Sequence, residues 1–588
     1  MPYDNLENET IAISLLGSEI WRKVFWPNGS TPIRMYPMRR VNDSVLWFMN
    51  ELTSRVVAES GIPTDIYHLG KILLRSLKDD PDFVLQIDGA TGEQETTGSV
   101  LERSVRCAIA LKKLGLQRGD AIILMAPNHL DLAIPFYAAL YLGVIVAPID
   151  RTLGVNELHG TFEAIRPKTI FCQSNRALDV ELALKEMDEQ AFIVTFDTGS
   201  SLCSFKQFLE TYGDKSSVDE FKPTDFDPED TIALLISTSG TTGLPKSAAA
   251  TQKNLVISSP YIWTRHTQFP HPTKMAFIVS PLQWVTAILM FLMSPIVRFT
   301  RLQTSQAVTP QHACHLINTY KPTYKIVNPL FMNSLLRSEG GLHCDISCFE
   351  TIIVGGSAVT ADFIQKIKKI TPNTEVLNGL GMSETTTIVF ISEGLNPGSA
   401  TVGKPIGCLQ YRLIDTETQQ DIYEPNKNGE LWVKGPGVVK GYYRNPEATA
   451  EAFTEDRWFK TGDMYYRDEN YNFFFVERIK LLLKYMNHQI SPMELEALIR
   501  QHPGVQEVAV TGIPDPKCGE LPVACVVRRP DGRVTADEIK QLVKENLADT
   551  KQLRGGVIFL DTIPQTPTAK VHQKKLKVIA MQCYANGS

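Results

Sequence analysis

The sequence predicts an α/β protein with a large N-terminal part built on parallel-type α/β subdomains and a small α+β part at its C-terminus. Three observations lead to this fold class. Strand patterns alternate with helical patterns from Asp65 to about Pro270, and again between residues 323 and 381. Short alternating strands follow Gly429, and a compact helix-and-strand module begins near Arg478. Strands that alternate with helices are typical of a parallel sheet with helices on its faces.

The first series predicts helices and strands in a regular order. Helical apolar spacing is found in SVLERSVRCAIALKKLGL (99–116) and LAIPFYAALYLG (132–143). Buried strands are predicted at GDAIILMAP (119–127), VIVAPID (144–150), TIFC (169–172), AFIVTF (191–196) and TIALLIST (231–238). The most apolar stretch, VTAILMFLMSPIV (285–297), has 13 residues and one proline. It is too short to span a bilayer and is expected to be a buried helix.

The second half predicts two further units. TYKIVN (323–328), ETIIVGG (350–356) and TEVLNGLG (374–381) resume the parallel pattern, and GELWVKG, WFKTGD and NFFFVER indicate a small antiparallel or barrel-like unit. The last segment contains the helices SPMELEALIRQH and TADEIKQLVKENL and the strands VQEVAVTGI, PVACVVRR and GGVIFL. We therefore predict an N-terminal extension over residues 1–45, a large domain over 46–477 and a small domain over 478–588.

Composition narrows the functional classes. Of 588 residues, 43% are apolar and 21% are charged, which is typical of a soluble protein of two to four domains. The 59 basic and 65 acidic residues give a net charge of −6, so no nucleic-acid partner is expected. Ten cysteines without zinc spacing favour reduced thiols inside the cell. With no basic signal-peptide region, the predicted location is cytoplasmic; a peroxisomal one is the alternative, although no S-K-L address ends the chain.

The stretch STSGTTGLPKS (237–247) has the composition of a phosphate-binding loop. It follows a buried strand and is expected to precede a helix. Its hydroxyls can donate to phosphate oxygens, its glycines permit close backbone approach, and its lysine supplies a positive charge. The residues concerned are Ser239, Gly240, Thr241, Thr242, Gly243 and Lys246. Pro245 stands where a Walker A loop needs a glycine and a backbone N–H, so a different phosphate-binding device is predicted.

Two acidic motifs follow downstream. NGLGMSETT (378–386) places Gly379 and Leu380 before Ser383 and Glu384, and a carboxylate beside a phosphate is the oxygen ligand that Mg²⁺ prefers. A glutamate favoured by a helix N-terminus is the structural alternative. FKTGD (459–463) presents Asp463 at a turn, where a carboxylate can bind ribose hydroxyls, although an aspartate after glycine is also an ordinary turn.

Two basic segments complete the set and establish a resemblance. ERIKLLLKYMNHQISPMELE (477–496) carries Arg478, Lys480 and Lys484 and alone is equally compatible with a solvated basic helix end. IPQTPTAKVHQKKL (563–576) carries Lys570, which alone is better explained as an ordinary surface lysine. In order and spacing, and together with GELWVKGPGVVKGYYRNPEAT and LRGGVIFLDTIP, the motifs resemble the adenylate-forming superfamily from about residue 65 to 580. That superfamily comprises acyl-CoA synthetases, the adenylation domains of peptide synthetases, and firefly luciferases with their non-luminous insect relatives.

The resemblance implies a reaction in two halves. A carboxylate attacks the α-phosphate of ATP to give an acyl-adenylate and pyrophosphate, and a thiol, usually CoA, then displaces AMP. The loop around Lys246 would hold pyrophosphate, Glu384 would hold Mg²⁺ with Ser383 near the α-phosphate, and Asp463 would bind ribose with help from Arg478. Lys570, on a small domain that rotates about a hinge near Lys480, would reach the α-phosphate. Gly379, Leu380 and Lys484 would lie along the nucleotide and CoA paths, and Trp284, Gly355, Gly356 and Ser357 would wall the acyl pocket.

The sequence also departs from the family pattern. Leu380 replaces the usual aromatic residue beside adenine, Ser247 and Ala569 replace glycines beside the two lysines, and Met486 and Asn487 occupy the stretch near the CoA path. Trp284 stands where luciferases and coumarate ligases carry histidine, and Ser258 where luciferases carry an arginine that contacts luciferin. Light emission is therefore not expected.

The favoured interpretation is an AMP-forming acid–thiol ligase that uses ATP, Mg²⁺ and CoA on a fatty or other hydrophobic carboxylic acid. The alternative is a catalytically impaired relative that binds nucleotide or acyl ligand as a sensor or scaffold. A luciferase-type oxygenase is the third reading. Chain length, physiological substrate and oligomeric state are left open by the sequence.

Overall fold

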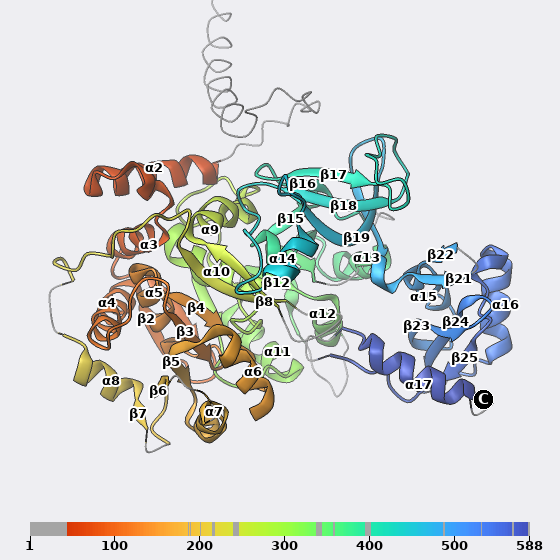
Figure 1. Cartoon of the computed structure of the whole chain (residues 1–588), viewed down its shortest axis with the longest axis horizontal. Helices are drawn as coiled ribbons and strands as arrows, with labels where there is room; N and C mark the ends of the chain where they lie inside the picture. The colour runs from red at the N-terminus through yellow and green to blue at the C-terminus, as the bar shows by residue number, and fades with distance from the viewer. Residues whose placement is uncertain are drawn as a thin grey trace, which may run out of the picture. The chain divides into compact units, whose positions relative to one another are not determined.

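The computed structural model describes residues 44–588, apart from 186, 188–189, 200–201, 215–217, 239–245, 337–343, 357–358, 394–400, 486–487, 531, 567–569 and 586–588. Residues Ser44–Ser588 form one compact unit. Its main elements are labelled in Figure 1.

The first large sheet is mostly parallel. Its strands, in spatial order, are β16 (Lys404–Pro405), β15 (Ile388–Ile391), β14 (Glu375–Gly381), β13 (Thr351–Gly355), β12 (Tyr324–Val327), β10 (Met275–Phe277), β11 (Thr300–Gln303), β1 (Val84–Asp88) and β2 (Gln94–Thr96). The strands from β14 to β1 pair in parallel, whereas β2, β15 and β16 pair antiparallel with their neighbours. Most residues of the parallel strands are buried, as expected for strands covered on both faces.

The second large sheet is also mostly parallel. Its strands, in spatial order, are β7 (Cys203–Ser204), β6 (Phe192–Thr195), β5 (Pro167–Cys172), β3 (Ala121–Met125), β4 (Ile145–Pro148), β8 (Ile232–Thr238) and β9 (Lys246–Thr251). Only the last pair, β8 and β9, runs antiparallel among the described strands of this sheet.

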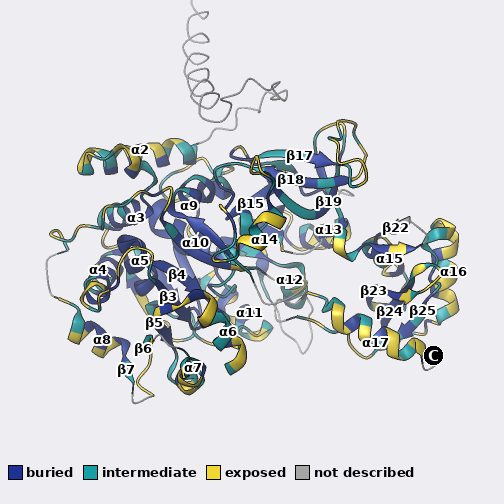
Figure 2. Ribbon diagram, in the orientation of Figure 1, coloured by how far each residue is buried: buried dark blue, intermediate teal, exposed yellow. Residues whose placement is uncertain are grey.

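Two uniformly apolar helices belong to the largest hydrophobic core. Every residue of α5 (Ala133–Leu142) is buried, and α10 (Val285–Val297) is buried from Ala287 onward. Both are dark blue in Figure 2. A helix that is hydrophobic all round has no face for water and must be enclosed. The prediction of a buried helix at 285–297 is confirmed.

The remaining helices of the large part cover the sheets or connect strands. They are α2 (Ser44–Ser60), α3 (Leu69–Lys78), α4 (Thr97–Lys113), α6 (Val155–Ile165), α7 (Ala177–Leu184), α8 (Phe205–Tyr212), α9 (Gln252–Ser258), α11 (Pro310–Tyr320), α12 (Pro329–Leu336), α13 (Ala361–Ile370) and α14 (Pro446–Ala452). Several begin at a threonine whose hydroxyl accepts a backbone N–H, for example Thr96, Thr309 and Thr360. These caps satisfy N–H groups that a helix leaves unpaired at its start.

Two antiparallel sheets follow along the chain. The first consists of β17 (Gln410–Ile414), β18 (Gly429–Lys434), β19 (Phe459–Arg467) and β20 (Phe473–Arg478). The second contains β22 (His488–Ile490), β21 (Leu483–Tyr485), β24 (Gly519–Arg528), β23 (Val505–Asp515) and β25 (Gly556–Phe559), the last being parallel to β24. It packs with α15 (Pro492–Ile499), α16 (Ala536–Asn546) and α17 (Gln573–Ala585). The predicted fold class is confirmed: a large N-terminal α/β part precedes a smaller C-terminal α+β domain.

Candidate functional site

The loop predicted to bind phosphate joins two paired strands. Thr238, at the end of β8, lies opposite Lys246, at the start of β9, and its hydroxyl donates to the Lys246 carbonyl at 3.1 Å. The prediction of a helix directly after the loop is therefore wrong. Residues 246–251 continue the ladder, and α9 begins only where Thr251 accepts the Asn254 N–H and caps it. Ser239, Gly240, Thr241, Thr242 and Gly243 lie outside the described residues.

Lys246 is connected to Glu384 through a tyrosine. The Lys246 Nζ atom lies 5.2 Å from the centre of the Tyr442 ring, and the Tyr442 hydroxyl donates to Glu384 Oε1 at 2.7 Å. Burial raises the pKa of Tyr442, and the Glu384 carboxylate raises it further, so the phenol keeps its proton and remains a donor. The sequence did not identify Tyr442 as a site residue, although it lies in the family-like stretch GYYRNPEAT.

The turn that carries Glu384 is fixed by backbone contacts. Ser383 and Glu384 belong to a short 3₁₀ turn, Ser383–Thr385, which follows the end of β14. The Val439 N–H donates to the Glu384 carbonyl oxygen at 2.9 Å, so the turn is tied to the segment that leads to Tyr442. Ser383 and Glu384 are both half-buried and keep access to solvent.

Two of the predicted glycines are required by the spacing of strands. A Cβ atom on Gly355 would lie 2.1 Å from the Gly379 carbonyl oxygen, and one on Gly379 would lie 2.8 Å from Ile353 Cγ2. Only glycine permits this approach of β13 to β14. Gly356 follows with φ = +83°, and Leu380 is half-buried opposite Phe390 of β15. Ser357 lies outside the described residues.

Asp463 is a buried carboxylate with one oxygen that accepts no hydrogen bond from the described residues. It is 7% exposed, and its Oδ1 lies 3.3 Å from Arg478 Nε but has no hydrogen-bond partner among the described residues. Burial raises the pKa of Asp463 to about 6; the charges of Glu384 and Glu477 act in the same direction, and those of Arg478 and Lys570 oppose them. A buried acceptor of this kind calls for a ligand or another partner.

Lys570 interacts electrostatically with the same pair. Its loop is closed by hydrogen bonds between the Thr566 and Lys570 backbones at 2.7 Å and from Lys570 N to Thr566 Oγ1 at 3.2 Å. The residue reaches solvent, yet the protein around its ammonium group lowers the pKa of Lys570; Arg478 lowers it further, and Asp463 opposes the shift. The structure therefore brings Lys570, Arg478 and Asp463 together.

An exposed glutamate contacts two of the predicted cations. Glu451, near the end of α14, lies 3.8 Å from Lys246 Nζ through one oxygen and 3.8 Å from Lys480 Nζ through the other. No sequence motif marked Glu451, because an exposed glutamate on a short helix is an ordinary residue. Lys484 is exposed on β21, where it pairs with Gln489 of β22 and its backbone N–H donates to Glu520 Oε2 at 3.1 Å. Met486, Asn487 and Ala569 lie outside the described residues.

Glu477 joins the end of β20 to the start of α15. Its carboxylate accepts the Arg478 N–H at 2.9 Å, the Met493 N–H at 3.1 Å and the Ser491 hydroxyl at 3.5 Å. Burial raises the pKa of Glu477, and these hydrogen bonds oppose the shift. The predicted junction near residue 477 is thus held by a side chain as well as by the backbone.

A narrow cavity lies at the start of α10, the helix that the predicted acyl-pocket residue Trp284 precedes, but Trp284 does not line it. Trp284 is half-buried and precedes α10, where its carbonyl accepts the N–H groups of Ala287 and Ile288. The cavity is lined by Ala276, Phe277, Ile278, Ser280, Thr286, Met290, Tyr324 and Ile326, from β10, α10, β12 and the segment before α10. Ser258, in contrast, is buried and hydrogen-bonded to Thr386 at 2.6 Å, so it cannot reach a ligand.

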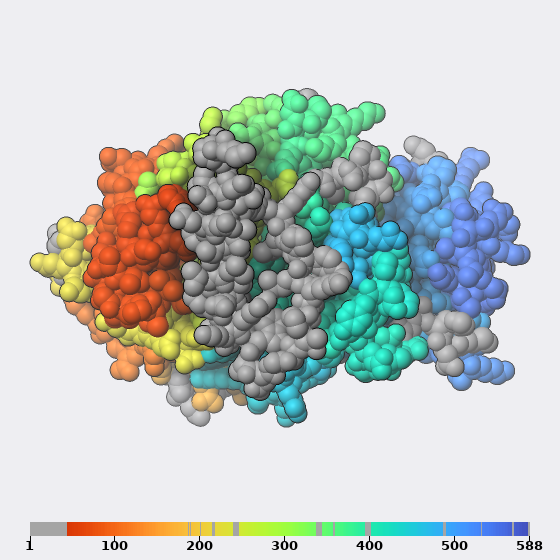
Figure 3. All heavy atoms as spheres, turned by 90° about the horizontal axis from the view of Figure 1, so that it is seen from above, coloured from red at the N-terminus to blue at the C-terminus, as the bar shows by residue number. Residues whose placement is uncertain are grey.

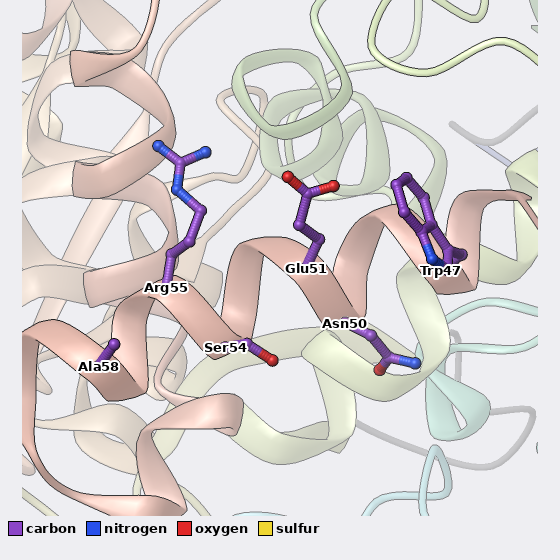
Figure 4. A pocket seen from close by; sticks show the side chains of 6 residues that line it. All are labelled: Trp47, Asn50, Glu51, Ser54, Arg55 and Ala58. Atoms are coloured by element: carbon purple, nitrogen blue, oxygen red, sulfur yellow. The ribbon is translucent and has the colours of Figure 1, made fainter.

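A second, shallow hollow lies on one exposed helix. Its lining comes entirely from α2: Trp47, Asn50, Glu51, Ser54, Arg55 and Ala58 (Figure 4). The red surface in Figure 3 marks the beginning of the described chain, to which this helix belongs. The hollow contains none of the predicted site residues.

The described residues contain no group of three His, Cys, Asp or Glu side chains arranged to hold a metal ion. None of the described helices is long and apolar enough to cross a bilayer. All ten cysteines are free thiols in this structure.

Two family profiles match the chain. The profile described as AMP-binding enzyme matches residues 73–443, and that described as AMP-binding enzyme C-terminal domain matches residues 494–570. The chain is 31% identical over 495 residues to luciferin 4-monooxygenase of Photuris pensylvanica, covering 81% of this chain and 88% of that protein. It is 28% identical to 4-coumarate-CoA ligase 1 of Narcissus pseudonarcissus, covering 84% and 91% respectively.

Solved structures share the fold. ATP-bound MatB from Rhodopseudomonas palustris superimposes with a TM-score of 0.78 at 24% identity, covering 87% of this chain and 99% of MatB. The luciferase-like enzyme from the nonluminescent mealworm Zophobas morio superimposes with a TM-score of 0.62 at 26% identity, covering 70% and 95%.

Proposed function

Because the chain belongs to the AMP-binding enzyme family, we propose that it is an ATP-dependent carboxylate–CoA ligase. It would activate a carboxylic acid as acyl-AMP with release of pyrophosphate and then transfer the acyl group to CoA. The proposal includes a large AMP-binding domain over residues 46–477, a small C-terminal lid domain over 478–588 and an extension over 1–45. Its predicted cytoplasmic location stays a prediction.

One observation carries the proposal: Asp463 interacts electrostatically with Arg478, Glu384 and Lys570, which come from segments far apart in the chain. Two cations and one further carboxylate around a buried, unsatisfied acceptor suit a ligand that has both phosphate charges and ribose hydroxyls. An ordinary surface cluster would leave Asp463 hydrated rather than 7% exposed.

We assign the roles as follows. Lys246 and the loop before it bind the departing pyrophosphate, and Asp463 with Arg478 binds the ribose. Lys570 neutralises charge at the α-phosphate as the carboxylate attacks, which is the electrostatic and positioning task of such a transfer. Gly379, Leu380, Ser383, Lys480 and Lys484 line the nucleotide and thiol paths, and Trp284, Gly355, Gly356 and Ser357 the acyl path.

Glu384 is compatible with Mg²⁺. Its Oε1 accepts the Tyr442 hydroxyl, which fixes the carboxylate, and the residue keeps access to solvent. Mg²⁺ is commonly bound by one or two protein carboxylates together with substrate phosphates and water, so a single glutamate fits this mode. When bound, the ion would offset phosphate charge; the protein's own part is to hold the carboxylate in place through Tyr442.

A second candidate function rests on Leu380. An apolar residue replaces the aromatic one that stacks on adenine in the family, and it is half-buried opposite Phe390. A relative that binds nucleotide or acyl ligand without turning it over would tolerate this change. Such a protein would bind ATP but would not catalyse carboxylate-dependent ATP–pyrophosphate exchange.

The test is carboxylate-dependent ATP–pyrophosphate exchange over a panel of acids, with thioester formation measured in the presence of CoA. We expect exchange with at least one acid and its loss in Lys570→Ala. The matched control is Lys574→Ala, an exposed lysine on α17. No exchange with any acid would refute the enzyme proposal, and exchange without thioester would limit the activity to adenylation. Full exchange in Lys570→Ala would show that the lysine is misassigned.

A further inference from the structure

Glu451 connects two lysines that belong to separate predicted motifs. Its Oε2 lies 3.8 Å from Nζ of Lys246, which begins β9, and its Oε1 lies 3.8 Å from Nζ of Lys480, just beyond β20. Among the described residues, Glu451 is the only carboxylate that forms an ion pair with either lysine. One exposed carboxylate is therefore shared between a cation of the predicted phosphate-binding loop and a cation of the predicted domain junction.

The short helix that carries Glu451, α14, is held at both ends. Before it, the Tyr442 N–H donates to Thr449 Oγ1 at 2.9 Å, and Tyr442 itself pairs with β9 through an isolated bridge. After it, Phe453 pairs with Phe459 of β19, and the centroids of the two rings lie 5.3 Å apart. The backbone of α14 is thus fixed against the strand that Lys246 begins, so the contact of Glu451 with this lysine depends on the two side chains alone.

A bound phosphate and Glu451 would compete for the same ammonium group. The Lys246 Nζ atom also lies 5.2 Å from the centre of the Tyr442 ring, so the ring and the carboxylate together define where this cation lies. Two anions beside one cation repel each other, so phosphate binds Lys246 most strongly when Glu451 releases it. Because the Glu451 side chain is 68% exposed, water screens this competition. Exposed ion pairs of this kind change an equilibrium by up to about fivefold.

We infer that Glu451 is a positioning residue that competes with pyrophosphate for Lys246 and so assists the departure of this product. The inference rests on the proposed function, in which Lys246 binds pyrophosphate, and adds to it a residue that no sequence motif marked. The shared carboxylate also gives Lys480 a part, because Glu451 is free to bind Lys480 more strongly when phosphate binds Lys246. Such coupling is reciprocal, so the contact with Lys480 in turn draws Glu451 away from Lys246.

The experiment titrates inorganic pyrophosphate into the full-length protein by calorimetry, so the readout does not depend on turnover. Glu451→Gln removes the charge and keeps the shape, and we expect it to bind pyrophosphate about two- to fivefold more tightly than the wild type. A structural defect would weaken binding instead. The gain should shrink between about 0.05 and 0.5 M salt, because screening weakens exposed charge pairs. Glu447→Gln, an exposed glutamate in the first turn of the same helix, is the matched control and should bind pyrophosphate like the wild type.

A second variant tests whether the carboxylate is shared. Lys480→Gln leaves Glu451 to Lys246 alone, so it should weaken pyrophosphate binding about twofold, and this effect should vanish in the Glu451→Gln background. Equal or weaker binding by Glu451→Gln would overturn the inference, and an equal effect of Lys480→Gln in both backgrounds would overturn the part given to Lys480. Absence of pyrophosphate binding in every variant would overturn the inference together with the role of Lys246. Tighter binding by Glu451→Gln without exchange on any acid would support the inference and refute only the ligase function.

Discussion

Replacing the buried Lys325 by methionine is expected to stabilise the protein at neutral pH. Lys325, on β12, is 1% exposed, and its Nζ has no hydrogen-bond partner among the described residues. Its ammonium position lies 4.1 Å from the centre of the Phe277 ring and 5.4 Å from that of Phe331. Burial lowers the pKa of Lys325 to about 7 from its ordinary 10.5, and the nearby Cys344 opposes the shift.

The magnitude follows from proton linkage. In the unfolded chain the amine binds a proton up to its ordinary pKa, whereas in the folded protein it loses that proton above about pH 7. Folding therefore becomes more favourable as pH rises from about 7 to about 10.5, and below this window the full penalty applies. At about 1.36 kcal/mol for each tenfold difference in proton affinity, the penalty is ~5 kcal/mol. Methionine fills a similar volume without a charge, so the substitution removes this penalty.

The assay is the melting temperature of wild type and Lys325→Met from pH 6.5 to 10.5. The unfolding entropy is about 2.1 cal/mol/K per residue, and the proposed large domain (46–477) has roughly 430 residues. The variant should therefore melt ~5 °C higher than the wild type at pH 7. The gap should close as pH approaches 10.5. Lys366→Met, an exposed lysine on α13, is the control and should show no gap that depends on pH. A gap in Lys325→Met that is the same at both ends of the range would refute the argument.

Three further changes test the site. Asp463→Asn removes a buried carboxylate whose pKa burial raises to about 6, so above pH 6 the variant should have an unfolding free energy higher by up to ~3 kcal/mol. The same change should raise the KM for ATP tenfold or more, and an unchanged KM would show that Asp463 is not in the nucleotide site. Tyr442→Phe removes the 2.7 Å hydrogen bond to Glu384 and should slow exchange about three- to tenfold with an increased Mg²⁺ requirement, and a normal Mg²⁺ titration would contradict the proposed link. Gly355→Ala places a methyl group 2.1 Å from the Gly379 carbonyl and should cost about 1–3 kcal/mol of stability, measured as a lower melting temperature; a variant that melts like the wild type would show that the strands can separate.

The sequence predicted the sheets well because each buried strand is marked by an apolar run of its own residues. The apolar runs at β3, β4, β5 and β8 follow from burial on both faces of a parallel sheet, and α10 follows from 13 residues without a polar face. The sequence of residues 246–251 has no such signal: serine and alanines are compatible with helix or strand, and pairing with β8 decides between them. Tertiary context therefore overrode the expected helix.

The site was less accessible to sequence reasoning than the fold. Lys246, Glu384 and Asp463 were predicted from residue type beside turns, and the order and spacing of their motifs led to the family resemblance. Tyr442 and Glu451 were missed because their importance lies in contacts with residues distant in the chain. The spacing of apolar residues does not predict which tyrosine donates a hydrogen bond to which carboxylate.

The carboxylate of Glu477 has a practical consequence for dividing this protein into fragments. Its two oxygens are satisfied by the backbone of Arg478 on one side and of Met493, in the first turn of α15, on the other. A gene truncated after residue 477 would remove both N–H groups and leave a carboxylate that the intact chain keeps 4% exposed without its donors. A truncation placed after α15, at residue 499, keeps both donors but exposes Leu495 and Ile499, which pack in the core of the following sheet, so neither cut at the predicted domain junction leaves a fully satisfied fragment.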